Sequence, residues 1–194
     1  MPSTTTSRRA WCAVIALVLV AGCGGGSDSD EPAATKAPSS AAPTAAPTTA
    51  APDPGPRPQD DRSDAGAIEF SEFVVNRIVG VTTGADIDDV LTLATADCKG
   101  CLNLAQQTQK DGTVKQEFES APVITDAKVT DTSDDGSQYL VEQVLELSPG
   151  RKVDTATGTT VETFDESTRL AMKVILTWAD DKWVLYNYSS EKVS

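Results

Sequence analysis

Two cysteines near the middle of the chain, Cys98 and Cys101, are spaced so that they could bind a metal, exchange electrons or form a disulfide. The sequence contains no histidine, which excludes His-ligated zinc, a Ser-His-Asp triad and a Cys-His nucleophile. A zinc site would need carboxylate ligands or a second chain, and a thioredoxin-type pair would open a helix within a βαβ unit. We therefore interpret the pair as a structural disulfide, and a thiol-disulfide redox role is the alternative.

A third cysteine, Cys23, ends a segment whose order of residues is typical of a bacterial export signal. Residues 1–10 lack acids and contain two arginines, and an apolar run of about eleven residues follows, too short to span a bilayer. The run closes with Leu-Val-Ala-Gly-Cys, which resembles the lipobox, where the cysteine sulfur receives diacylglycerol. The sequence predicts a signal peptide over residues 1–22, cleavage between Gly22 and Cys23, and a lipid anchor at the extracytoplasmic face of the cell membrane.

A Pro/Ala/Thr-rich stretch follows the expected lipidation site. From residue 24 to residue 62 it has no aromatic or long aliphatic side chain, so it cannot bury enough apolar surface to offset its conformational entropy. We expect residues 23–62 to form the lipidated N-terminus and a disordered linker, which could extend to about 120 Å in polyproline geometry. Its Thr and Ser residues could also carry O-linked sugars.

The charge balance restricts the partners of the chain. There are 16 Lys and Arg against 29 Asp and Glu, which gives a formal net charge of −13. Nucleic acids need clustered basic residues, so we expect no nucleic-acid partner. The sequence also contains no motif for a cofactor or a metal ion, and we expect neither.

The remaining residues, 63–191, are predicted to form one extracytoplasmic domain of the α+β class. Apolar residues recur at helical spacing from Asp64, the expected N-cap, to Gly84, and again in residues 86–94 and 102–110. The period then changes to two. Strands are expected over residues 122–130, 138–147, 169–178 and 183–188, and residues 151–160 are expected to form a loop or a weak hairpin.

Helices followed by an antiparallel sheet resemble the cone-shaped nuclear-transport-factor-2-like (SnoaL-like) fold, in which a curved sheet wraps around N-terminal helices. The chain also resembles an actinobacterial lipoprotein family known as domain of unknown function 6318, over about residues 63–190. The features that carry this resemblance are the acylated leader, the Pro/Ala/Thr spacer, Ala65-Gly66-Ala67, Thr83-Gly84, Cys98-x-x-Cys101 and the closing segment from Leu176 to Val184. Because that family has no assigned activity, the resemblance implies a fold and a location but no catalytic residue.

Other residues that could act chemically have simpler interpretations. The acidic pairs at 134–135, 165–166 and 180–181 fall in expected turns, where a solvated role is favoured over acid/base catalysis. Gln143, Tyr186 and Tyr188 could line the mouth of a cavity, but an interior amide with satisfied hydrogen bonds and ordinary strand residues are the simpler interpretation. Trp178 and Trp183 are expected to form a cross-strand pair beside the last turn.

These observations favour a non-enzymatic ligand-binding or protein-interaction domain. Its expected partners are the membrane, through the lipid, and either an envelope protein or a small apolar ligand. The alternative is a small isomerase or cyclase that uses a buried carboxylate in a cavity with a Tyr as hydrogen-bond donor. Catalytic residues are therefore not assigned.

Overall fold

The first apolar, helix-periodic segment forms α1 (Asp64–Thr83) in a computed structural model that describes residues 55–193. Its N-cap is Ser63, whose hydroxyl accepts a hydrogen bond from the Gly66 amide at 3.2 Å. The predicted cap, Asp64, instead lies in the first turn, where its carboxylate complements the helix dipole. The helix ends at Gly84, which adopts the left-handed conformation with a φ of 117°, as the glycine there predicts.

Two further helices follow, both with bounds that differ from the predicted ones. The segment predicted as residues 86–94 contains a single turn, α2 (Asp88–Leu91). The third helix, α3 (Lys99–Asp111), begins three residues before the predicted start. The reason is that Cys98 is its N-cap, with the Cys98 Sγ accepting a hydrogen bond from the Cys101 amide at 3.2 Å.

Four strands form an antiparallel sheet in the order β2-β3-β6-β7. Their bounds are β2 (Val123–Thr132), β3 (Gln138–Leu147), β6 (Thr168–Ala179) and β7 (Lys182–Val193). All four predicted strands are present, although β7 continues five residues beyond its predicted end. Asp180 and Asp181 join β6 to β7 with φ values of 51° and 58°, the positive values that a tight two-residue hairpin requires.

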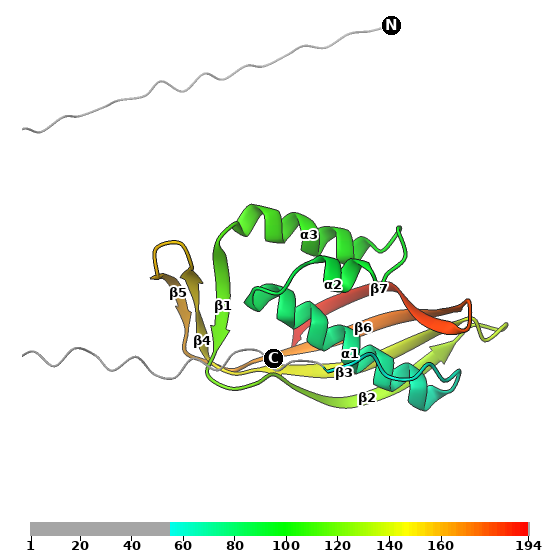
Figure 1. The fold of residues 1–194 in the computed structure, drawn as a ribbon. Coiled ribbons are helices and arrows are strands. Elements are labelled where there is room, and N and C mark those ends of the chain that lie inside the picture. Colours follow the sequence, from blue (N-terminus) through cyan, green and yellow to red (C-terminus); the bar gives the residue numbers. More distant parts are fainter. Residues whose placement is uncertain (1–54, 194) are drawn as a thin grey trace, which may run out of the picture. The chain divides into compact units, whose positions relative to one another are not determined.

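A second, three-stranded antiparallel sheet has the order β1-β4-β5. It consists of β1 (Val114–Phe118), β4 (Gly150–Asp154) and β5 (Thr159–Phe164), which stand together at one end of the domain (Figure 1). The sequence did not predict β1, because Lys, Gln and Glu occupy its three central positions in succession and leave no apolar period. Of the two interpretations of residues 151–160, the hairpin is correct and the loop is wrong.

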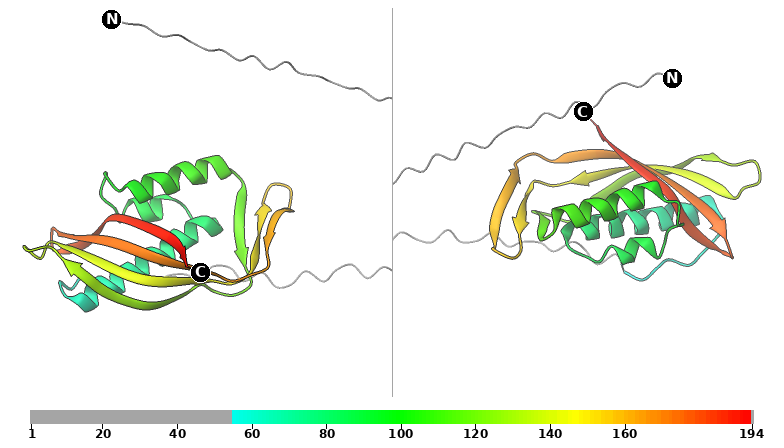
Figure 2. Two further views of the ribbon diagram at one scale, coloured as in Figure 1. Left: turned by 180° about the vertical axis from the view of Figure 1, so that it is seen from behind. Right: turned by 90° about the horizontal axis from the view of Figure 1, so that it is seen from above.

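The core lies between α1 and the concave face of the four-stranded sheet (Figure 2). The predicted inner face of β6 is confirmed, since Met172, Val174 and Leu176 are buried. The α+β class and the cone-like arrangement, with helices packed on a curved antiparallel sheet, are therefore confirmed. The largest fully buried side chains are those of Trp183, Phe70, Leu176, Leu185, Val74 and Val75.

The end of the predicted linker packs against this domain. Residues 55–62, which we call the strap, hydrogen-bond to α1, to β7 and to the turn between β2 and β3. These contacts join residues 55–62 to the domain that was predicted to begin at residue 63. The strap has no apolar periodicity, and it binds through charged side chains and backbone groups, which hydrophobic patterning does not detect.

Candidate functional site

The paired cysteines lie at the start of α3 and are joined by a disulfide, as predicted, with Cα atoms 5.3 Å apart. Both residues are only 1% exposed, so their sulfur atoms are shielded from an attacking thiol. The pair does open a helix, a feature of redox-active cysteines that the sequence interpretation missed. Its burial nevertheless favours the structural role over thiol exchange.

The disulfide corner is pressed against β7. The Gly100 amide donates a hydrogen bond to Asn187 Oδ1 at 3.0 Å. A Cβ atom added at Gly100 would lie 2.5 Å from the Tyr188 carbonyl oxygen and 2.8 Å from the Tyr188 ring. Only glycine therefore allows this close approach of the corner to the strand. The Cys-Lys-Gly-Cys segment therefore holds the start of α3 against β7.

The carboxylates occupy the surface, as predicted. Among residues 55–193, the buried polar side chains are Ser71 and Gln143, and no Asp or Glu belongs to the buried class. Asp135 stabilises the turn after β2 by accepting hydrogen bonds from Ser133 and from the amide and hydroxyl of Ser137, which lower its pKa to about 2. Burial, helped by the neighbouring charge of Glu69, raises the pKa of Glu72 on α1. The described residues contain no cluster of three potential metal ligands.

The three residues considered for a cavity mouth do not come together as a site. Gln143 is buried at 3% exposure, as an interior amide should be, but no protein group among the described residues hydrogen-bonds to either of its amide atoms. A register shift in the β6–β7 ladder leaves Tyr186 without a partner on β6, and its side chain is 41% exposed. Tyr188 packs against the core, and burial raises its pKa to about 12.

The predicted tryptophan pair is confirmed, and it belongs to a larger aromatic cluster. The rings of Trp178 and Trp183 meet edge to face with centroids 4.9 Å apart, and Tyr139 contacts Trp183 in the same geometry at 4.9 Å. Trp183 is fully buried. Trp183 is therefore part of the packed core, with Trp178 and Tyr139 packed against it.

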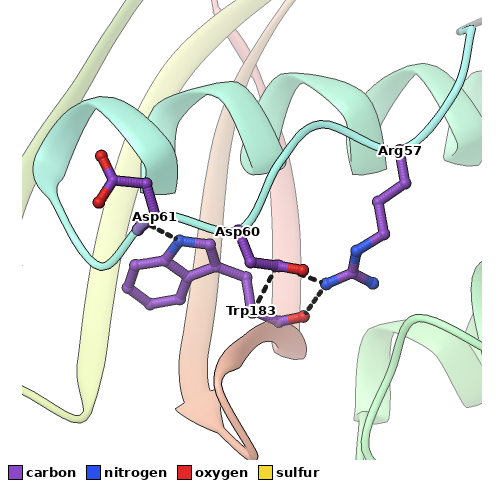
Figure 3. Close-up of polar contacts among 4 residues, drawn as sticks. All are labelled: Arg57, Asp60, Asp61 and Trp183. Atoms are coloured by element: carbon purple, nitrogen blue, oxygen red, sulfur yellow. Dashed lines mark hydrogen bonds and ion pairs between the residues drawn. The ribbon is translucent and has the colours of Figure 1, made fainter.

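The strap closes over Trp183 (Figure 3). The Trp183 indole Nε1 donates a hydrogen bond to the Asp61 carbonyl oxygen at 2.8 Å. Its backbone amide donates to Asp60 Oδ1 at 2.9 Å, and Arg57 Nη2 donates to its backbone carbonyl at 2.6 Å. The Arg57 guanidinium also pairs with Asp60 at 2.8 Å and lies 4.5 Å from the centroid of the Phe70 ring. Every polar group of Trp183 is thus satisfied by three residues of the strap.

A cleft of about 290 Å³ opens where α1 and α3 end and β1 begins. Apolar side chains of Val81, Leu104 and Val114 line part of it. Its polar and charged lining residues include Thr82, Gln107, Thr108, Asp111, Lys115, Gln116 and Lys152. Elements distant in sequence build this cleft, so sequence reasoning did not find it. The signal that was available is the pair of helix stops at Gly84 and Gly112, which both lie on its wall.

Charged groups in the cleft are already partly engaged. Lys115 Nζ donates to the Gly84 carbonyl oxygen at 3.3 Å, beside the carbonyl end of α1. Lys152 pairs with Glu162 at 2.7 Å. The carboxylate of the cleft, Asp111, is exposed and accepts a hydrogen bond from Gln107 at 2.7 Å. This geometry suits binding better than acid/base catalysis, which relies on a carboxylate in a dry site.

Two shallower depressions lie on the four-stranded sheet. One, of about 190 Å³, is lined by residues of β2, β3 and β6 around Lys128, Glu142 and Lys173. It adjoins the register shift in β2, where Asp126 has a φ of 57°. The other, of about 210 Å³, lies near the turn between β2 and β3. Both are smaller than the cleft beside α1.

The expected lipidation and cleavage residues, Gly22 and Cys23, lie outside residues 55–193, as does the expected signal peptide. Within the described part of the chain, no helix is long and apolar enough to cross a membrane.

Comparisons with known proteins find distant structural similarity. No protein-family model and no characterised protein matches the sequence. The intermembrane space region of the chloroplast protein ARC6 is 13% identical with a TM-score of 0.47, over 65% of this chain and 97% of that one. A protein described as a calcium/calmodulin-dependent kinase II association domain from Exiguobacterium sibiricum is 10% identical with a TM-score of 0.42, over 64% and 91% of the two chains.

A protein described as an aromatic ring hydroxylase from Novosphingobium aromaticivorans is 16% identical with a TM-score of 0.43, over 69% of this chain and 90% of that one. The three proteins differ from one another in their described roles. These similarities are too distant to transfer a partner or an activity to this chain.

Proposed function

We propose that this protein is a non-enzymatic binding domain, held at the extracytoplasmic face of the cell membrane by a lipid on Cys23. The observation that supports the binding role is the cleft of about 290 Å³ between α1, α3 and β1. The absence of a buried Asp or Glu among residues 55–193 argues against the isomerase or cyclase alternative. The buried disulfide argues against the redox alternative in the same way.

The anchoring part of the proposal is supported by the sequence. The lipobox-like segment supplies the acylated cysteine, and the Pro/Ala/Thr-rich spacer would separate the domain from the bilayer. Membership of the actinobacterial lipoprotein family called domain of unknown function 6318 belongs to this proposal too. Metabolic labelling with palmitate should mark the wild-type chain and leave Cys23→Ser unmarked. An unlabelled wild-type chain in the cytosolic fraction would exclude the anchor.

The cleft suits a small, mainly apolar ligand. Its volume lies at the lower end of the range for small-molecule sites, roughly 300–1,000 Å³. Val81, Leu104 and Val114 would contact the apolar body of the ligand, while Thr82 and Gln107 lie on the wall where a polar end could be oriented. An envelope protein that inserts an apolar side chain into the same cleft is the second candidate occupant.

Two neighbouring glutamines on α3 allow a matched test. Both Gln106 and Gln107 are exposed, but only Gln107 lines the cleft. We expect Gln107→Trp to fill the cleft, whereas Gln106→Trp should place the same ring in solvent. A set of small apolar compounds is titrated into the labelled protein and binding is followed by NMR chemical shifts. The proposal predicts shifts at Leu104 and Val114 in the wild type and in Gln106→Trp, but not in Gln107→Trp.

Crosslinking of the native protein in membranes tests the second occupant. An envelope protein that is crosslinked to the wild type and Gln106→Trp, but not to Gln107→Trp, would identify the cleft as a protein-docking site. If neither small compounds nor envelope proteins distinguish the two variants, the cleft has no binding role and the proposal is wrong.

A further inference from the structure

The outer edge of β7 presents backbone groups that an antiparallel strand could bind. β7 is the last strand in the order β2-β3-β6-β7, so only one of its edges is paired, with β6. Trp183 lies opposite Trp178 and Leu185 lies opposite Leu176 in that pairing. Both Trp183 and Leu185 direct their N–H and C=O groups outward, because these groups bond to segments outside the sheet. If these groups were left unbonded, the edge would be a template on which another strand could pair.

At Leu185, main-chain groups of the segment before α3 close this edge. The Leu185 amide donates to the Leu93 carbonyl at 2.8 Å, and the Thr95 amide donates to the Leu185 carbonyl at 2.9 Å. These two bonds form a short parallel bridge. Further along, the Gly100 amide at the disulfide corner bonds to the Asn187 side chain. Residues 93–100 thus cover the middle of the edge.

At Trp183, the strap closes the edge with side chains instead of a strand. Asp60 supplies the acceptor for the Trp183 amide, and Arg57 supplies the donor for the Trp183 carbonyl (Figure 3). The ion pair between Arg57 and Asp60 holds the donor and the acceptor side by side. Together the two side chains imitate the C=O and N–H groups of a neighbouring strand.

We propose that the strap is an edge guard, which keeps the domain monomeric by occupying the outer edge of β7 at Trp183. The partner that it excludes is the same edge of a second copy of this chain. Trp183 is self-complementary for such pairing, because two antiparallel residues placed opposite each other can exchange both N–H···O=C bonds. In this register Lys182 of one copy lies opposite Val184 of the other, so no like charges are placed directly opposite each other beside Trp183.

Removing both side chains of the guard tests this role. The mature chain, residues 23–194 with Cys23→Ser to exclude lipid-driven association, carries Arg57→Ala and Asp60→Ala. We expect hydrogen exchange of the Trp183 amide to become at least about tenfold faster at low protein concentration. At high concentration, light scattering after size-exclusion chromatography should show twice the monomer mass.

A second ion pair provides the control. Arg169 and Glu146 pair at 2.9 Å across β6 and β3, away from the edge of β7. The double variant Glu146→Ala and Arg169→Ala should keep the wild-type exchange of Trp183 and the monomer mass. Near-ultraviolet circular dichroism checks that each variant is folded. If the guard variant is unfolded, Asp60→Asn replaces it, and we expect the same two changes at smaller amplitude.

Two results would overturn the proposal. If a folded guard variant keeps the Trp183 amide as protected as in the wild type, the strap does not hold the edge. If exchange becomes faster but the mass stays that of a monomer at every concentration tested, the strap only packs locally and guards nothing.

Discussion

The edge strands β7 and β5, which belong to different sheets, differ in how much of the protein covers them. The outer edge of β7 is covered in succession by the strap, by residues 93–95 and by the disulfide corner. The edge strand β5 is exposed over nearly its whole length, and Val161 on it is 59% exposed. The covered edge is the one that belongs to the hydrophobic core, because β7 carries the buried Trp183 and Leu185 while no residue of β5 is buried.

The cleft lies beside the sheet that contains the exposed strand β5. It is lined by residues of β1 and β4, which belong to the same sheet as β5, and by the ends of α1 and α3. The side chains that line it do not fill the space between them, which leaves the cleft of about 290 Å³. The comparison indicates that stability is concentrated around β7 and that a binding surface is available where the helices end. Four substitutions or conditions test this division, in order of expected effect.

The largest effect is expected for Trp183→Ala. It removes a fully buried ring with two edge-to-face aromatic contacts and a hydrogen bond to the strap. We expect the free energy of unfolding to fall by about 3–5 kcal/mol in urea denaturation. Val161→Ala on β5 should change it by less than about 0.5 kcal/mol. Equal losses in the two variants would contradict the division between the two edges.

A smaller loss is expected for Gly100→Ala at the disulfide corner. The added Cβ would lie 2.5 Å from the Tyr188 carbonyl oxygen, which is a backbone atom that cannot rotate away. We expect the free energy of unfolding to fall by about 1–3 kcal/mol, measured by chemical denaturation. Ala105→Gly, at a partly buried position of the same helix, controls for helix propensity and should cost about 1 kcal/mol. An unchanged Gly100→Ala variant would show that the corner is not tightly fastened.

The disulfide itself should contribute modestly. Cys101→Ala opens a loop with a sequence separation of only three residues, for which loop-closure entropy predicts about 1–2 kcal/mol. The melting temperature should therefore fall by a few degrees, and the domain should stay folded. Complete unfolding after this substitution would mean that the corner is essential to the core, and a disulfide-reductase activity in the wild type would favour the redox alternative.

The smallest expected effect is a loss of stability in acid, when the Asp60 carboxylate of the strap becomes protonated. Burial raises the pKa of Asp60, but the hydrogen bonds from Arg57 and from the Trp183 amide, with the Arg57 charge, outweigh it and hold the pKa below its ordinary value of 3.8. Because the folded-state pKa is lowered, the carboxylate stabilises the folded state above pH 3.8, and this contribution is lost as the pH falls through the folded-state pKa.

The melting temperatures of the wild type and Asp60→Asn, measured against pH, check this prediction. The wild type should be slightly more stable near neutral pH, and the two curves should converge in acid. A difference between them that persists in strong acid would show that the charge of Asp60 is not what holds the strap.

Much of the fold could be predicted from local patterns. The alternation of Leu170, Met172, Val174 and Leu176 placed β6 and its buried face, and Gly84 placed the end of α1. Residues with no apolar period were missed, such as β1, whose strand is stabilised by pairing with β4. The bounds of α2 and α3 were also wrong. Only one turn of the first forms, with Ile87 as its N-cap, and the second begins early because the Cys98 sulfur caps it, which local apolar spacing does not reveal.

The sequence by itself determined the α+β class, the disulfide pair and the tryptophan pair, because period, cysteine spacing and a two-residue turn are properties of neighbouring residues. Only the tertiary structure decided where the cleft lies and that the strap covers Trp183. Arg57 and Trp183 are 126 residues apart in the chain, and the walls of the cleft come from four separate elements. Such contacts depend on how the elements pack, and local spacing carries no record of that packing.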